Sequence, residues 1–282
     1  MNVSLSIDSF PLDKEIARDM HNLLGEFPID YNTVLNAPVW QKSDAKGFAV
    51  LAYAENGDLI GFATCLDIMG LHHYEWSAIV HPDFRRKGIG TALADGVSFG
   101  LRQREAESEL AVLIEDKNAS AFLESLGYGA DFKEILLGAP ALESEELPEG
   151  LSFMPYGGEQ AELTALLVAA FDEEVVPFLA HNIEEAGRDI WLMKKDGRIT
   201  ATAAFISEED VLWVTSFAVD PKEQGKGYGQ AFLRWCRYHA FLEGKNQVLL
   251  DVDTTNEAIR VYEKAGFLPI NTIEYWKRKE EG

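Results

Sequence analysis

Cysteine, long apolar runs and basic residues are all scarce in this 282-residue chain. The two cysteines, Cys65 and Cys236, stand far apart with no clustered partner, which argues against a disulfide framework or a zinc site and favours a reducing cytoplasm. No apolar run approaches the roughly 20 residues that a membrane helix needs. The N-terminus lacks the layout of a signal peptide. We therefore expect a cytoplasmic protein with no metal and no membrane partner.

Positive charge is outnumbered: 25 Lys and Arg stand against 47 Asp and Glu, which gives a net charge of −22. A balance of this sign repels phosphate backbones, so we expect no nucleic-acid partner. It attracts cationic or amine substrates over long range, although an acidic surface also serves solubility alone. Charge therefore does not identify the substrate.

The stretch from Val211 to Leu233, VLWVTSFAVDPKEQGKGYGQAFL, carries the most informative motif. A β-branched and aromatic run ends at Asp220, three alternating glycines follow (Gly225, Gly227 and Gly229), and helical periodicity then begins. Glycines let successive N–H groups converge, and the first turn of a helix has four N–H groups without internal acceptors. Strand, glycine turn and helix start together predict an anion site suited to phosphates.

The same pattern occurs about half a chain earlier, where residues 74–93 read YEWSAIVHPDFRRKGIGTAL. Two copies of one rare pattern predict an internal duplication. Neither turn is a dinucleotide fingerprint, because Leu93 and Phe232 stand where the third glycine would be. Neither is a Walker loop, since no Gly-Lys-Ser/Thr occurs in place. For a single copy, a helix-capping turn with solvated basic residues would be the alternative, and the repetition disfavours it.

The order of predicted elements also repeats, around hairpin turns at residues 55–58 and 195–197. Strands are expected at residues 3–7, 48–53, 59–68, 74–80, 109–114, 129–138, 151–154, 189–193, 198–206, 211–219, 247–251 and 267–276. Helices are expected at residues 13–24, 88–103, 118–126, 159–171, 177–186, 227–243 and 256–265. The acidic, proline-containing segment at residues 138–150 is typical of a linker. We predict an α/β fold of two tandem domains, residues 1–140 and 151–282, joined by residues 141–150. Each domain is expected to be a twisted mixed sheet flanked by helices.

Two segments resemble the acyl-CoA signature of the GNAT superfamily of N-acetyltransferases: Gln224-x-x-Gly227-x-Gly229 after Val-Asp-Pro, and Arg85-x-x-Gly88-x-Gly90 after Val-His-Pro. Later elements follow in the family's order, with Asn256, Tyr262 and Gly266-Phe267 in the second half, and Asn118 and Gly127-Tyr128 in the first. The resemblance covers nearly the whole chain as two tandem copies. It implies two GNAT domains and acetyl-CoA as co-substrate, with no metal.

The resemblance also implies which residues hold the coenzyme. In the second half these are Phe217, Ala218, Val219, Gln224, Gly225, Lys226, Gly227, Tyr228, Gly229, Gln230 and Asn256. In the first half they are Ile79, Val80, Arg85, Arg86, Lys87, Gly88, Ile89, Gly90, Thr91 and Asn118. In the family, the strand before the turn parts from its neighbour, and a backbone N–H there stabilises the oxyanion of acyl transfer.

Tyr262 is the expected general acid. Acetyl transfer from a thioester expels a thiolate, and a nearby phenol can donate the proton as the C–S bond breaks. Tyr262 lies four residues before Gly266, at the family's tyrosine position; the alternative is a helix tyrosine packed on the sheet. The equivalent residue before Gly127 is Leu123, so the first half has a complete phosphate turn without an obvious acid. We expect the second half to be catalytic.

The general base is harder to place, with Glu75 and the carboxylates at residues 208–210 as weak candidates beside a water relay. No serine or cysteine lies in a nucleophile context, which favours direct attack by a primary amine of a small molecule or peptide in a ternary complex. The alternatives are an acyl-CoA-binding sensor without turnover and a structural unit with vestigial turns. The acceptor, the acyl length and the choice between monomer and homodimer stay open.

Overall fold

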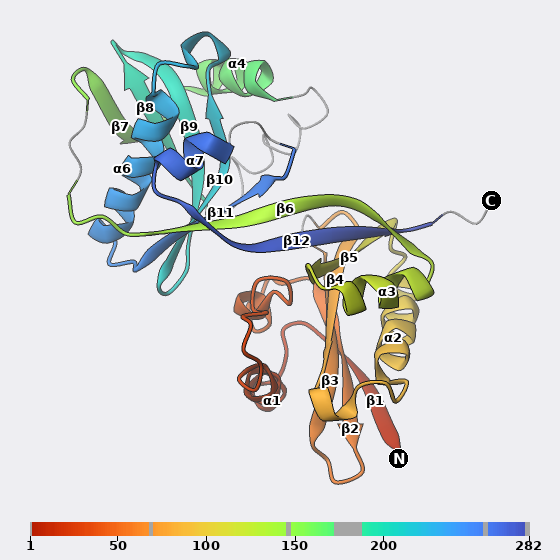
Figure 1. The fold of residues 1–282 in the computed structure, drawn as a ribbon. Coiled ribbons are helices and arrows are strands. Elements are labelled where there is room, and N and C mark those ends of the chain that lie inside the picture. Colours follow the sequence, from red (N-terminus) through yellow and green to blue (C-terminus); the bar gives the residue numbers. More distant parts are fainter. Residues whose placement is uncertain (1, 68–69, 145–147, 172–187, 256–258, 280–282) are drawn as a thin grey trace. The chain divides into compact units, whose positions relative to one another are not determined.

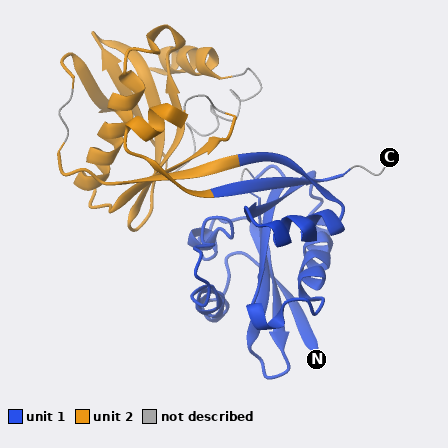
Figure 2. Cartoon of the chain, viewed as in Figure 1, with its two compact units in different colours: residues 1–133, 272–282 blue, residues 134–271 orange. Residues whose placement is uncertain are grey.

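The computed structural model describes residues 2–67, 70–144, 148–171, 188–255 and 259–279. They form two compact units, one of residues Met1–Lys133 with Thr272–Gly282 and the other of residues Glu134–Asn271 (Figure 2). Each unit is a mixed sheet with helices on its faces, so the predicted α/β class is confirmed. No described helix is both long and apolar enough to span a membrane. The expected helix at residues 177–186 lies outside the described residues.

The first unit has the strand order β1-β2-β3-β4-β5-β12, in which only the β4–β5 pair is parallel (Figure 1). Helix α2 covers one face because Leu93, Val97 and Leu101 recur at helical spacing and are all buried. Helix α1 packs on the other face with Trp40, whose ring lies 5.6 Å from that of Phe62. The elements are β1 (Val3–Ser9), α1 (Lys14–Leu24), η1 (Ala37–Val39), β2 (Gly47–Ala54), β3 (Leu59–Asp67), β4 (His73–Val80), η2 (Pro82–Phe84), α2 (Ile89–Gln103), β5 (Ser108–Ile114) and α3 (Lys117–Ser125).

The second unit has the order β6-β11-β10-β9-β8-β7, again with a single parallel pair, β10–β11. Helices α6 and α7 cover one face around Phe232, Trp235 and Phe267, and α4 covers the other through a small leucine cluster. The elements are β7 (Leu151–Pro155), α4 (Gln160–Ala170), β8 (Asp189–Lys195), β9 (Arg198–Ser207), β10 (Val211–Val219), η3 (Pro221–Glu223), α6 (Tyr228–Leu242), β11 (Gln247–Asp253) and α7 (Ile259–Lys264).

Strands β6 (Tyr128–Pro140) and β12 (Leu268–Arg278) each run from one unit into the other. Residues 134–140 of β6 pair with the whole of β11, and residues 273–277 of β12 pair with β5. The closing strand of each half therefore completes the sheet of the other half. This differs from the expectation of two self-contained sheets, because alternating apolar residues fit either partner equally well. The predicted linker begins where β6 ends, and the boundaries at residues 140 and 151 stay a prediction.

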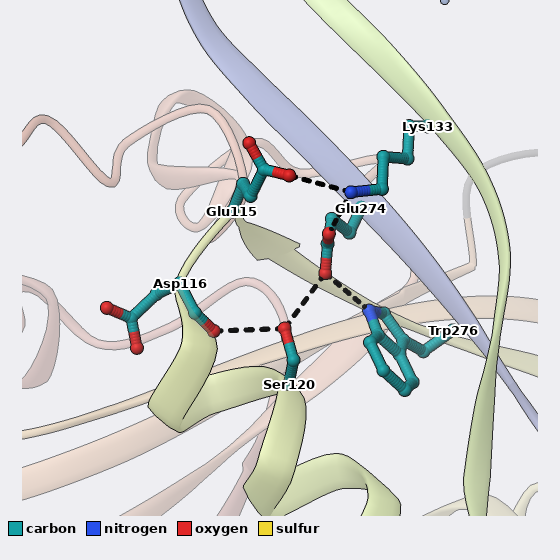
Figure 3. Close-up of polar contacts among 6 residues, drawn as sticks. All are labelled: Glu115, Asp116, Ser120, Lys133, Glu274 and Trp276. Carbon is teal, nitrogen blue, oxygen red and sulfur yellow. Dashed lines mark hydrogen bonds and ion pairs between the residues drawn. The ribbon is translucent and has the colours of Figure 1, made fainter.

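A buried carboxylate fixes β12 within the first unit (Figure 3). Glu274 is only 4% exposed, and Lys133 Nζ lies 2.5 Å from its Oε1. Its Oε2 accepts hydrogen bonds from Ser120 Oγ and Trp276 Nε1, both at 3.0 Å. Burial alone would raise the pKa of Glu274, but the hydrogen bonds from Lys133, Trp276 and Ser120 outweigh it and lower the pKa. The ionised carboxylate thus ties the C-terminal strand to β6 and α3.

Candidate active site

The pairing between the parallel strands β10 and β11 ends partway along their length. Their ladder runs from Val211↔Gln247 to Trp213↔Leu249, yet β10 continues to Val219 and β11 to Asp253. The first unit repeats this opening, since β4 pairs with β5 only over residues 73–76 and 108–111. Backbone groups beyond the last pair are free to bond a ligand that lies between the strands.

A β-bulge distinguishes the second opening from the first. The register of β10 against β9 shifts between Thr215 and Ala218, and Ser216 adopts a left-handed φ of 51°. The corresponding β3–β4 ladder keeps a continuous register from Gly61↔Val80 to Asp67↔Tyr74. A bulge leaves one residue out of the ladder and re-aims its neighbours. It thereby turns Phe217 and Val219 onto the face of α6, where both pack against the aromatic core.

The glycine turn that follows β10 opens directly into α6. Gly227 is the N-cap with a left-handed φ of 84°, a conformation that glycine adopts without strain. The first N–H with an intrahelical acceptor is that of Ala231, which donates to Gly227 O at 3.0 Å. The N–H groups of Tyr228, Gly229 and Gln230 precede it and form the anion-binding end of the helix. Gln224 Nε2 donates to Val219 O at 3.4 Å and so ties the turn to the strand.

The first half builds the same turn from different side chains. Gly88 is the N-cap of α2 with a φ of 82°, and Ala92 N donates to Gly88 O at 3.0 Å. Arg85 Nε donates to Val80 O at 3.0 Å, which repeats the bond of Gln224. The other predicted positions divide by exposure: Ile79 and Ile89 are buried, Val80 and Gly90 are partly buried, and Arg86, Lys87, Thr91 and Asn118 are exposed.

A cavity of about 650 Å³ lies over the second glycine turn. Ten predicted residues line it: Phe217, Ala218, Val219, Gln224, Gly225, Gly227, Tyr228, Gly229, Gln230 and Tyr262. Lys226 does not line it; its ammonium pairs with Glu223 Oε2 at 2.7 Å. Asn256 lies outside the described residues. The structure thus gathers strand end, turn and tyrosine around one space.

Tyr262 reaches this cavity from α7. Its side chain is 8% exposed, and its ring meets that of Phe217 edge-on with 6.2 Å between centroids. Burial raises the pKa of the Tyr262 phenol, so the hydroxyl stays protonated at neutral pH. Leu123, at the equivalent place in α3, is buried in the apolar core of the first unit and offers no proton. The asymmetry between the halves is therefore one of chemistry as well as of sequence.

Five further residues line the cavity that sequence reasoning did not assign to it. Glu223, Val261 and Lys264 adjoin motif residues, so their proximity could have been inferred from the turn and the helix. Ala170 and Phe171, at the end of α4, come from more than 40 residues before the motif. No local pattern marks them, because the contact depends on how α4 packs on the opposite face of the sheet.

The candidate general bases, Glu75 and the carboxylates at residues 208–210, do not line this cavity. Residues 208–210 form the turn before β10, at the end of that strand opposite to Phe217, and the Glu208 and Asp210 side chains form local hydrogen bonds. Glu208 Oε2 accepts from Trp213 Nε1 at 3.3 Å, and Asp210 Oδ1 accepts from Asn246 Nδ2 at 3.1 Å. Glu75 lies on β4 of the first unit. Among the described residues, no three His, Cys, Asp or Glu side chains are grouped to hold a metal ion.

Comparison with known proteins agrees with this geometry. The family described as "Acetyltransferase (GNAT) family" matches residues 17–128 and 157–267. The chain belongs to the GNAT acetyltransferase family. It is an acetyl-transferring enzyme with two GNAT regions, and each match ends where an exchanged strand, β6 or β12, begins.

Curated relatives and solved structures match most of the length of this chain. The mycothiol acetyltransferase of Saccharomonospora viridis is 30% identical over 77% of this chain and 79% of its own length. That of Nocardia farcinica is 26% identical over 76% and 77%. A GCN5-related N-acetyltransferase from Sphaerobacter thermophilus superposes with a TM-score of 0.70 at 20% identity, covering 96% of this chain and 94% of that one. A tandem GNAT protein from the clavulanic acid biosynthesis pathway gives 0.69 at 14% identity, covering 99% and 100%. These structures share the fold of this GNAT protein.

Proposed function

We propose that this GNAT enzyme moves the acetyl group of acetyl-CoA to a primary amine of a small molecule or peptide, and that its second half is the catalytic one. The observation that carries the proposal is the cavity over Gly227, which combines a helix N-terminus, a strand opening and the phenol of Tyr262. Each supplies one thing that thioester aminolysis needs.

The glycine turn suits the pyrophosphate of coenzyme A. The N–H groups of residues 228–230 lack intrahelical acceptors and lie at the positive end of the α6 dipole. Such a site binds an anion through the backbone, which matters in a chain whose net charge of −22 repels phosphate. Gln224 and Gly225 line the same space. The thioester arm then lies along β10, where the ladder with β11 is absent.

The chemical step follows from that placement. The amine nitrogen attacks the acetyl carbonyl carbon, a C–N bond forms, and the carbonyl oxygen takes up negative charge that a backbone N–H beside the Ser216 bulge stabilises. The C–S bond then breaks, Tyr262 donates its phenolic proton to the leaving sulfur, and the nitrogen gives up one proton to solvent. The tyrosine regains its proton from solvent before the next turnover.

The first half supports a second role, acyl-CoA binding without turnover. It retains the Gly88 turn and Arg85, but it has Leu123 in place of a phenol and lacks the bulge. Binding needs the turn and Arg85, whereas turnover needs the phenol for proton donation and the bulge for oxyanion stabilisation. A sensor or structural role for this half is therefore compatible with catalysis in the other.

The test is thiol release from acetyl-CoA with a panel of primary amines that includes the acceptor of mycothiol acetyltransferases. We expect at least one amine to accelerate release above hydrolysis, and calorimetry to detect acetyl-CoA binding. If acetyl-CoA binds but no amine in the panel accelerates thiol release, the sensor role is favoured instead. Absence of both would refute the proposal.

A further inference from the structure

The second unit contains another cavity, of about 400 Å³, that the acetyl-transfer chemistry does not use. It is lined by His239 and Glu243 at the C-terminal end of α6 and by residues of β8 and β9. His239 comes eleven positions after Tyr228, which lies at the glycine turn, and this corresponds to about 16 Å along the helix axis. The two cavities thus lie toward opposite ends of one helix.

Aromatic rings form the inner wall of this cavity. The His239 ring lies 4.6 Å from that of Trp191 and 5.5 Å from that of Phe205, and it stacks on Trp235 at 5.0 Å. Burial lowers the pKa of His239, more strongly than the neighbouring Glu243 and Asp189 raise it, so the imidazole is neutral at pH 7. Tyr156 adds a phenol to the lining. This aromatic part of the lining is uncharged and rich in π faces, although the lining also includes the guanidinium of Arg188.

Negative charge surrounds the mouth. Asp189 begins β8 and Glu243 caps the C-terminus of α6; both are exposed, and neither forms an ion pair or side-chain hydrogen bond with another described residue. Arg188 also lines the cavity and carries a positive charge, and its Nη1 donates to Thr215 Oγ1 at 3.5 Å. The C-terminal end of a helix also carries partial negative charge. All these features except Arg188 favour a cation over an anion.

We propose that this cavity binds a small organic cation, whose ammonium group rests between the aromatic wall and the carboxylates of Asp189 and Glu243. Aromatic faces attract ammonium groups through their quadrupoles, most strongly where water is partly excluded. The two carboxylates supply the counter-charge. The inference does not depend on the acetyl-transfer reaction, since the cavity shares no lining residue with the one over Gly227.

The probe pair is choline and its neutral isostere 3,3-dimethylbutan-1-ol, titrated into the full chain by calorimetry and by tryptophan fluorescence. Shape and apolar area are matched in this pair, so only charge differs. We expect saturable choline binding about tenfold or more tighter than binding of the alcohol. Equal binding of the two, or no saturable choline binding, would overturn the proposal.

Matched variants locate the site. Asp189→Asn and Glu243→Gln alter exposed side chains, so both variants should fold, and each should weaken choline binding by about twofold to fivefold. Asp196→Asn is the control, because this substitution removes the same charge as Asp189→Asn. Asp196 is an exposed carboxylate in the β8–β9 turn, just past the other end of β8. An Asp196→Asn effect as large as that of Asp189→Asn would assign the binding to general electrostatics and refute the site.

Discussion

Replacing Tyr262 by phenylalanine removes one hydroxyl from the cavity over Gly227 and leaves the ring in place. A positioned general acid typically contributes about 10²–10⁴-fold in rate, which corresponds to roughly 2.7–5.5 kcal/mol at 1.36 kcal/mol per tenfold. Among the described residues that line the cavity, the other phenol is that of Tyr228, which lies in the glycine turn and not beside Tyr262 on α7, so it should not replace Tyr262 as the proton donor. We therefore expect kcat to fall by about 100-fold or more.

The same change should leave folding and coenzyme binding almost untouched. The buried ring keeps its contact with Phe217, and the hydroxyl makes no hydrogen bond to another described residue. Its loss should cost less than about 1 kcal/mol, and Tm should therefore fall by no more than about 2–4 °C for a chain of this size. Because burial raises the pKa of Tyr262, the wild-type phenol stays protonated between pH 7 and 9, and kcat should show no decline from this group there.

The assay is thiol release under saturating amine, with acetyl-CoA affinity measured separately by calorimetry. Tyr238→Phe is the matched control, since Tyr238 lies on α6 against the same core without lining the cavity. An unchanged kcat in Tyr262→Phe would remove this residue from proton transfer. A loss of coenzyme affinity as large as the loss of rate would reassign it to binding.

Three further perturbations probe the turn, the exchanged strand and a perturbed carboxylate. A Cβ at Gly229 would lie 3.3 Å from Val261 Cγ1, so Gly229→Val should raise KM for acetyl-CoA by about tenfold or more. The matching change in the first half, Gly90→Val, should leave kcat/KM within about twofold. Equal loss of kcat/KM in both variants would contradict a single catalytic half. Glu274→Ala should lower the free energy of unfolding by about 2 kcal/mol in chemical denaturation, because the buried Trp276 Nε1 loses its acceptor, whereas Ser120 Oγ keeps Asp116 O and Lys133 keeps Glu115. A loss below about 0.5 kcal/mol would show that the buried carboxylate contributes little. Partial desolvation, and secondly the Glu134 carboxylate, raise the pKa of Asp251 to about 7. The folded state thus resists this ionisation, and stability is lost as pH rises toward and through 7. Asp251→Asn should therefore have a higher Tm than wild type at pH 8 but not at pH 4. The gain should be modest because the side chain is exposed. An identical difference in Tm at both pH values would exclude the titration of Asp251 as its cause.

Much of the site could be predicted because its parts are contiguous in the chain. The end of β10, the glycine turn and the start of α6 span residues 217–230, and their geometry depends on glycine conformations and helix ends rather than on distant contacts. Tyr262 was assigned from the family resemblance, four residues before Gly266, and it lines the cavity. The irregular pattern Thr215-Ser216-Phe217 interrupts the alternation of β10 and could have indicated the bulge.

Long-range pairing could not be predicted in the same way. The alternation in β6 and β12 specifies a half-buried strand and its faces, but it does not say which sheet receives it. The contacts of Glu274 with Lys133 and Ser120, which tie β12 to the first unit, join residues more than 130 positions apart. Ala170 and Phe171 enter the cavity through the packing of α4, which no local signal records.

The strand exchange gives the first half, which has Leu123 in place of Tyr262, a structural role in the second half. Beyond Leu249, β11 has no partner on the β10 side, and its residues 250–253 are held by β6 alone, through Leu250↔Leu137 to Asp253↔Glu134. Since β11 is one wall of the opening, the first half keeps that wall in place. Residues 151–282 expressed alone would expose both edges of this segment, and an unpaired edge strand distorts or aggregates.

We therefore expect the isolated second half to lack amine-dependent thiol release, and release to return when residues 1–150 are added in excess. Circular dichroism of the separate and mixed fragments would report whether the sheet re-forms. Full turnover by the second half alone would mean that β11 holds its course without β6, and the first half would then need a function of its own, such as binding a second coenzyme at the Gly88 turn.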